Sequence, residues 1–281
     1  MAEISAKEVA ALRKVTGAGM MDCKKALIEC AGDIEAAKTW LRERNLAGAA
    51  KRAGREADQG AIDVVNTGSV AALVELNCET DFVAKGEPFK AMVAKLAAHV
   101  AQVGDADVAN SSFEGSTVDT AITEFSGTLG EKMGLGRVVR YETNDGLLDA
   151  YKHIQETRGV IGVLVELGGV DGSDPVSQEL VHDVALHIAS AKPRYVSRDD
   201  VPDEEIEAER KVYEAQTREE GKPEAAIAKI VDGKMNKFFQ DNVLLAQGFV
   251  KDPKTTIAAL IATAGADAHV RRFVRVKIGE D

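Results

Sequence analysis

The sequence predicts an α+β protein in which a three-helix bundle precedes a duplicated β-β-α-β core that carries an inserted helical hairpin. Three observations lead to this prediction. Glycines separate helix-period apolar positions in residues 1–45, a strand and helix pattern occurs in 60–143 and again in 144–281, and a charged helix pair lies at about 194–245. Residues 46–59 are mostly small or charged, which is typical of a linker.

The bundle is the first predicted element. Ser5 and Glu8 have the spacing of a capping box, and Asp33 can cap a third helix after the break at Gly32. Met20 and Met21 follow a glycine-rich loop. They either offer an adaptable apolar contact surface or fill the core of the bundle.

The first copy of the core begins with β-branched runs at 61–65 and 70–76, which are separated by a hairpin signal. A helix with a clean apolar stripe follows from Pro88. A second helix near 117–131 leads to a strand at 137–142. The predicted order is therefore strand, strand, helix, strand.

The second copy repeats this order, with strands near 147–153, 159–167 and 271–278 and a helix at 176–191. Three segments recur in the same order: Leu73–Leu76 as Leu164–Leu167, Leu96–Ala101 as Val184–Ala189, and Arg137–Arg140 as Arg272–Arg275. Their shared order indicates an internal duplication. His99 and His187 fall within the repeated helix, which favours equivalent packing positions over a catalytic pair.

The inserted hairpin carries many charges and a narrow apolar seam that includes Ile206 and Tyr213. Such a seam is typical of a coiled-coil arm. Dimerisation, contact with a partner and a purely structural arm all remain open as its use.

Composition limits the partners. Acidic residues outnumber basic ones by 46 to 35, and the formal charge of −11 disfavours general binding to phosphate backbones. One basic cluster remains, formed by Arg42, Arg44, Lys51, Arg52 and Arg55. It is either an RNA contact or a solvated helix end and linker.

The three cysteines, without a closely spaced pair, indicate a reduced and therefore cytoplasmic compartment. No apolar run approaches the roughly twenty residues that a membrane span needs, so we expect no membrane contact. Phosphate-binding loops, G-x-S-x-G and H-E-x-x-H are absent, and the five histidines show no metal spacing. We therefore expect no catalytic residue, bound metal, cofactor or direct nucleotide binding, and no enzymatic activity.

One segment stands out at the end of the second predicted strand. Thr80 can cap a short helical turn, and Asp81 fits its first turn. Phe82 would then project as an aromatic anchor for a partner protein. The alternative is that Phe82 packs beside Phe89, one heptad further on.

Several segments resemble the elongation factor Ts family, the guanine-nucleotide exchange factors of elongation factor Tu. The segments are Thr16–Leu27, Asn77–Ala84, Gly162–Val165 and Ala191–Pro193. The resemblance spans essentially the whole chain. It implies that the bundle is ubiquitin-associated-like and that the hairpin is a coiled coil.

The resemblance also implies the site. In this family the segment matching Thr80, Asp81, Phe82 and Val83 enters the nucleotide domain of a Tu-type GTPase and disturbs its magnesium site. Further positions match partner contacts: Lys24, Leu129, Gly130 and His153. The implied function is promotion of GDP release during translation elongation. The alternative is an adaptor that binds partners through the N-terminal bundle.

Overall fold

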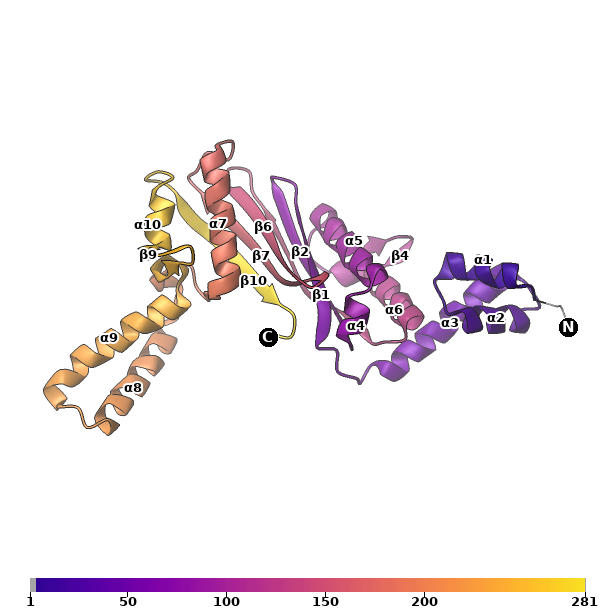
Figure 1. The fold of residues 1–281 in the computed structure, drawn as a ribbon, viewed down its shortest axis with the longest axis horizontal. Helices are drawn as coiled ribbons and strands as arrows, with labels where there is room; N and C mark the ends of the chain where they lie inside the picture. The colour runs from indigo at the N-terminus through magenta and orange to yellow at the C-terminus, as the bar shows by residue number, and fades with distance from the viewer. Residues whose placement is uncertain (1–3, 281) are drawn as a thin grey trace.

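The chain extends from a helical bundle, through a central pair of sheets, to a projecting helix pair (Figure 1). The structure is a computed structural model that describes residues 4–280. The first three residues of the predicted bundle and the last residue of the predicted second subdomain lie outside the described residues. The mixture of helices and sheets confirms the predicted α+β class.

The N-terminal bundle contains α1 (Ala6–Thr16), α2 (Met20–Glu29) and α3 (Ile34–Arg52). The predicted capping box is present, since Ser5 and Glu8 satisfy each other's free backbone donors. Asp33 accepts hydrogen bonds from two backbone N–H groups of α3. Helix α3 continues to Arg52, through part of the segment that the sequence interpretation assigns to a linker.

The first copy of the core holds a three-stranded antiparallel sheet in the order β1-β2-β5. Its elements are β1 (Gln59–Asn66), β2 (Val70–Cys78), α4 (Asp81–Ala84), α5 (Glu87–Val103), η1 (Val108–Asn110), β3 (Ser112–Phe113), β4 (Ser116–Thr117), α6 (Val118–Leu129) and β5 (Met133–Glu142). Strand β5 begins four residues before the predicted strand. Pairing with β2 extends it, although Gly134 and Gly136 weaken its local strand preference.

The second copy has the same sheet order, β6-β7-β10. Its elements are β6 (Leu147–Gln155), β7 (Arg158–Gly168), α7 (Pro175–Ala191), η2 (Arg198–Asp200), α8 (Asp203–Glu219), α9 (Glu224–Asn242), η3 (Leu244–Ala246), β8 (Gly248–Phe249), β9 (Asp252–Thr256), α10 (Ile257–Ala262) and β10 (His269–Lys277). The predicted hairpin is α8 with α9. It projects from the sheets in Figure 1 and has its own small core.

The duplication is visible in individual contacts. Leu73 pairs with Val139 in the first sheet, and Leu164 pairs with Val274 at the equivalent place in the second. Arg140 donates from Nε to the Ala101 carbonyl at 3.1 Å, and Arg275 donates from Nε to the Ala189 carbonyl at 3.2 Å. The two copies therefore share strand register and the contacts that fix the last strand against the helix.

The repeated histidines also occupy equivalent positions. The Nε2 atom of His99 lies 2.8 Å from Oγ of Ser111, and that of His187 lies 2.9 Å from Oε1 of Gln247. Each histidine joins its helix to the segment before the small hairpin of its own copy. The packing interpretation is therefore correct.

The two sheets pack on each other through a shared apolar cluster that includes Ile62, Leu73 and Leu164. Gly162 permits this approach, because a Cβ atom there would lie 2.6 Å from Leu73. Helices α5 and α6 contribute to the core of the first copy, and α7 and α10 to that of the second. This arrangement gives the first sheet a rigid backing.

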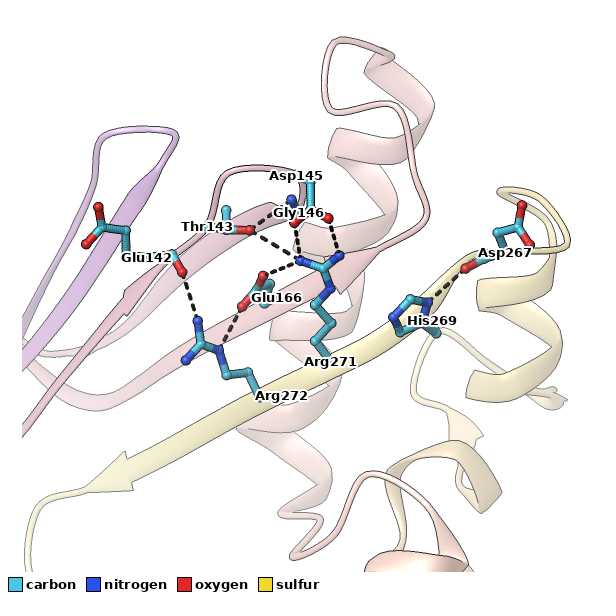
Figure 2. Close-up of polar contacts among 9 residues, drawn as sticks. All are labelled: Glu142, Thr143, Asp145, Gly146, Glu166, Asp267, His269, Arg271 and Arg272. Atoms are coloured by element: carbon cyan, nitrogen blue, oxygen red, sulfur yellow. Dashed lines mark hydrogen bonds and ion pairs between the residues drawn. The ribbon is translucent and has the colours of Figure 1, made fainter.

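A polar network reinforces the connection between the copies (Figure 2). Arg271 and Arg272 of β10 both bind the buried carboxylate of Glu166. Arg272 also donates to the carbonyl of Glu142 at 3.0 Å, and Arg271 binds Asp145 at 2.6 Å. Burial by itself raises the pKa of Glu166, but hydrogen bonds from Thr143 and the two arginines outweigh burial and lower it.

Candidate functional site

Phe82 lies on the surface, and the residue is 86% exposed. Phe89, in contrast, is fully buried in the core of the first copy. The interpretation that Phe82 packs beside Phe89 is therefore wrong. Helix α4 carries Phe82 directly after β2 (Figure 1). A large apolar side chain with few torsions, held in water, is suited to anchor a protein partner.

The turn that carries Phe82 is capped as predicted. The Thr80 hydroxyl accepts a hydrogen bond from the Val83 backbone N–H at 3.3 Å. Val83 packs against the core and Ala84 is buried within it. Thr80, Asp81 and Phe82 are all exposed, so one side of the turn is fixed while the other faces solvent.

Asp81 forms an ion pair with Lys85, one turn further on. The hydrogen bond from Lys85 holds the pKa of Asp81 below its usual value. Lys85 also binds Glu156 at 2.7 Å, and Glu156 lies in the turn between β6 and β7. The second copy therefore braces the exposed turn of the first.

A polar hollow of about 440 Å³ lies beside this turn, and Thr80, Asp81, Lys85, Glu156 and Arg158 are among the residues that line it. Arg158, which lines the hollow, donates to the Gly60 carbonyl of β1. Neither Lys85 nor Glu156 was predicted from the sequence. The four-residue spacing of Asp81 and Lys85 is a helix ion-pair signal, whereas Glu156 has no local signal.

Leu129 and Gly130 lie at the end of α6, in the segment that leads to β5. Leu129 packs partly against the core, and Gly130 ends the helix with a φ of 79°. Because β5 pairs with β2 up to Cys78 and Met133, this segment runs beside Thr80. The structure thus brings these two predicted contacts to the exposed turn.

Lys24 and His153 lie on other elements. Lys24 is exposed on α2, next to Met20 and Met21, which are 56% and 75% exposed. The interpretation that the two methionines fill the bundle core is therefore wrong. His153 is exposed on β6, where its Nδ1 atom lies 3.1 Å from the Tyr151 hydroxyl. The predicted contacts thus form several separate patches.

The basic cluster mostly contacts its own chain. Arg42 pairs with Glu124, Arg55 pairs with Glu79, and Arg52 donates to the Ser126 carbonyl at 3.2 Å. Arg44 stacks over Trp40 at 5.2 Å from the ring centroid. These contacts favour a structural role, in which α3 is held against α6.

Within residues 4–280 no group of three or more His, Cys, Asp or Glu side chains could hold a metal ion. Burial raises the pKa of the Cys78 thiol to about 12, so this cysteine stays protonated. No helix in the described part of the chain is long and apolar enough to cross a membrane.

Comparisons with known proteins agree on one family. The family profile described as Elongation factor TS matches residues 79–280. The chain is 45% identical over 284 residues to elongation factor Ts of Kineococcus radiotolerans, covering 99% of this chain and 100% of that one. It is 44% identical over 287 residues to the protein of that name from Streptomyces avermitilis, with 99% and 100% covered. The protein of that name from Rhodospirillum rubrum is 42% identical over 292 residues, with 100% and 94% covered.

Proposed function

The chain belongs to the elongation factor Ts family of translation elongation factors, and we propose that it promotes GDP release from an elongation factor Tu-type GTPase. The exposed turn enters the partner beside its nucleotide and disturbs its magnesium and phosphate site. The residues that do so are Thr80, Asp81, Phe82 and Val83. GTP then binds the emptied site. The observation that carries this proposal is the exposure of Phe82 on a turn that is capped by Thr80 and braced by the ion pair between Lys85 and Glu156.

The mechanism is differential binding. A GTPase holds GDP through magnesium and through backbone donors around the phosphates, so release is slow. A factor that binds the nucleotide-free conformation more tightly shifts the equilibrium towards it. By linkage, GDP must weaken the binding of the factor by the same amount that the factor weakens GDP binding. The chain then needs only a wedge and enough interface to hold it, and the magnesium ion belongs to the partner.

The remaining exposed patches supply that interface. We propose that Lys24 with the two exposed methionines, Leu129 with Gly130, and His153 contact the partner outside its nucleotide site. Their separation along the molecule suits a partner that lies across several elements. The chain would act in the cytoplasm, divided into a bundle at 1–45, a linker at 46–59 and core subdomains at 60–143 and 144–281.

Helices α8 and α9 project from the other end of the molecule from the bundle (Figure 1). We assign this arm no role in the exchange step. Dimerisation through the arm is a separate expectation, which sedimentation of the free chain at several concentrations would test.

The proposal is tested by release of fluorescent GDP from a purified Tu-type GTPase. We expect the chain to accelerate release in a saturable way. In equilibrium titrations, the factor should weaken GDP binding by the same ratio by which GDP weakens binding of the factor. For coupling of ordinary strength this ratio is roughly 5- to 150-fold. Unchanged release would overturn the proposal. Binding without acceleration would instead support an adaptor that acts through its N-terminal bundle.

A further inference from the structure

Two chain segments beside Phe82 are bonded to each other beyond the end of the sheet. The ladder between β2 and β5 ends at the pair Cys78 and Met133. One residue further out, the Lys132 N–H donates to Glu79 at 2.5 Å. On the other side, the Thr80 N–H donates to Glu131 at 3.0 Å. Each segment thus contributes a carboxylate that accepts a backbone N–H of the other.

Glu131 makes two contacts with Thr80. Besides the Thr80 N–H, it accepts the Thr80 hydroxyl proton at 2.6 Å. The same hydroxyl accepts the Val83 N–H at the start of α4. The Thr80 hydroxyl thus donates its proton to Glu131, which leaves the oxygen lone pairs free to accept from the N–H group of α4. Glu131 therefore fixes the rotamer of the residue that caps the turn.

The carboxylates are themselves held in place. The Ser126 hydroxyl donates to the carbonyl of Glu131 at 2.5 Å, so the backbone of Glu131 is bound to α6. Glu79 also pairs with Arg55, just beyond α3, at 3.1 Å. The hydrogen bond from the Lys132 N–H, and secondarily Arg55, hold the pKa of Glu79 below its usual value. The network joins α3, α6 and the two strand ends to one exposed turn.

Such support is needed because α4 has only four residues. A single helical turn fixes several torsions for very few internal hydrogen bonds, and it does not persist alone in water. Val83 and Ala84 hold one side of α4 to the core, but no apolar contact orients its exposed start at Thr80 and Asp81. The carboxylate of Glu131 orients Thr80, while Lys85, itself paired with Glu156, holds Asp81.

We propose that Glu131 is a positioning residue for nucleotide exchange: it orients Thr80 and thereby holds Phe82 in the projecting position in which it enters the partner. This inference rests on the proposed function. Its rival is that Glu131 contacts the partner directly and has no effect on the free chain.

Amide hydrogen exchange of the free chain separates these two possibilities without any partner. Glu131→Ala removes both acceptors, and Glu131→Gln keeps one of them. The amides of Thr80 and Val83 should exchange about tenfold faster or more in Glu131→Ala, as expected for loss of a charge-assisted hydrogen bond, and less so in Glu131→Gln. Glu114→Gln is the matched control, since it removes an exposed carboxylate paired with Lys95 in the same copy.

Exchange kinetics then connect the turn to function. Glu131→Ala should lower the maximal rate of stimulated GDP release severalfold, while the concentration of factor at half-maximal effect stays within about twofold. Glu114→Gln, which leaves the turn intact, should keep wild-type behaviour. Thr80→Val should also lower the maximal rate, and the double variant should cost less than the sum of the two single changes, because both remove the bond between the Thr80 hydroxyl and Glu131.

The outcomes are distinguishable. Unchanged amide exchange at Thr80 and Val83 in Glu131→Ala would overturn the positioning role. A loss confined to half-saturation would overturn it as well, since it would indicate a direct partner contact. A wild-type chain that fails to stimulate release would refute the proposed function instead, and the amide data would still decide whether Glu131 holds the turn.

Discussion

The two copies of the core differ most where the second strand of each meets its long helix. In the first copy, the connection from β2 to α5 contains α4 and the exposed Phe82. In the second copy, the connection from β7 to α7 is shorter and has no helical turn. Asp174 there simply caps α7, by accepting from the N–H groups of Val176 and Ser177.

After the long helix, the second copy has the longer connection. The first copy passes from α5 to η1 through four residues, 104–107. At the same place the second copy carries the arm of α8 and α9. The comparison shows that one sheet and helix framework tolerates a different insertion in each copy. The framework specifies the fold, and the insertion in the first copy carries the proposed activity.

The largest effect should come from making the first connection like the second. Replacing residues 79–86 by the sequence of residues 169–174 removes α4, Phe82 and the bonds to Glu131. We expect stimulated GDP release to be lost, because no wedge remains to distinguish the two states of the partner. Stopped-flow fluorescence measures the loss of GDP release, and circular dichroism checks that the replacement variant is still folded. An active replacement variant would break the comparison.

Phe89 and Phe82 offer a paired test within the first copy. Phe89→Ala opens a cavity in a closed core and should cost about 3–5 kcal/mol of unfolding free energy. Phe82→Ala should change that free energy by no more than about 0.5 kcal/mol, because its side chain is already in water. Urea unfolding of both variants measures the difference. Similar losses would show that Phe82 is part of the core in solution.

Removal of the arm tests whether the second insertion is equally separable. Replacing residues 198–240 by a short flexible linker removes most of a cluster that is distinct from the core of the second copy. We expect the urea midpoint of the core to shift little. The slope of the unfolding free energy against urea should fall, because less surface is exposed on unfolding. A collapse of the core would show that the arm is part of its framework.

The smallest predicted effect separates the repeated histidines. The Val250 N–H donates to Nδ1 of His187 at 3.3 Å, so Nε2 carries the proton and the ring is neutral. Burial lowers the pKa of His187 below its usual 6.5. The unfolded chain therefore binds the extra proton first, and stability should fall as the pH drops below about 6.5 towards the folded pKa.

The measurement is urea unfolding between about pH 5 and 7.5, with His187→Gln compared to wild type and His99→Gln as the matched control. As the pH falls over this range, the unfolding free energy of the wild-type chain and of His99→Gln should each decrease by about 1 kcal/mol or less. His187→Gln should not show this decrease. A parallel pH dependence in all three proteins would contradict the assignment.

Much of the framework was predictable, because each copy repeats a periodic signal. The repeat of Leu73–Leu76 as Leu164–Leu167 correctly predicted two equivalent sheets, and Pro88 marked the start of α5. The early start of β5 was not predictable, since its glycines have weak strand preference and only pairing with β2 extends it.

The site was predictable only in part. The cap by Thr80 followed from local chemistry, but spacing could not decide whether Phe82 was buried or exposed, because that depends on how α4 meets the core. Glu131 and Glu156 approach the turn from distant parts of the chain, and no local pattern indicates such contacts. The family resemblance identified Phe82 but not the residues that hold it.

The most direct test of the wedge is the effect of Phe82→Ala on two quantities measured with the same Tu-type GTPase. These are the maximal rate of stimulated GDP release and the affinity of the chain for the nucleotide-free partner. We predict a fall of roughly 30-fold or more in the maximal rate, on the scale of truncating a central aromatic anchor, with a much smaller loss of affinity. Equal losses in the two quantities would contradict the account, because they would show that Phe82 only binds the partner and does not drive the release of GDP.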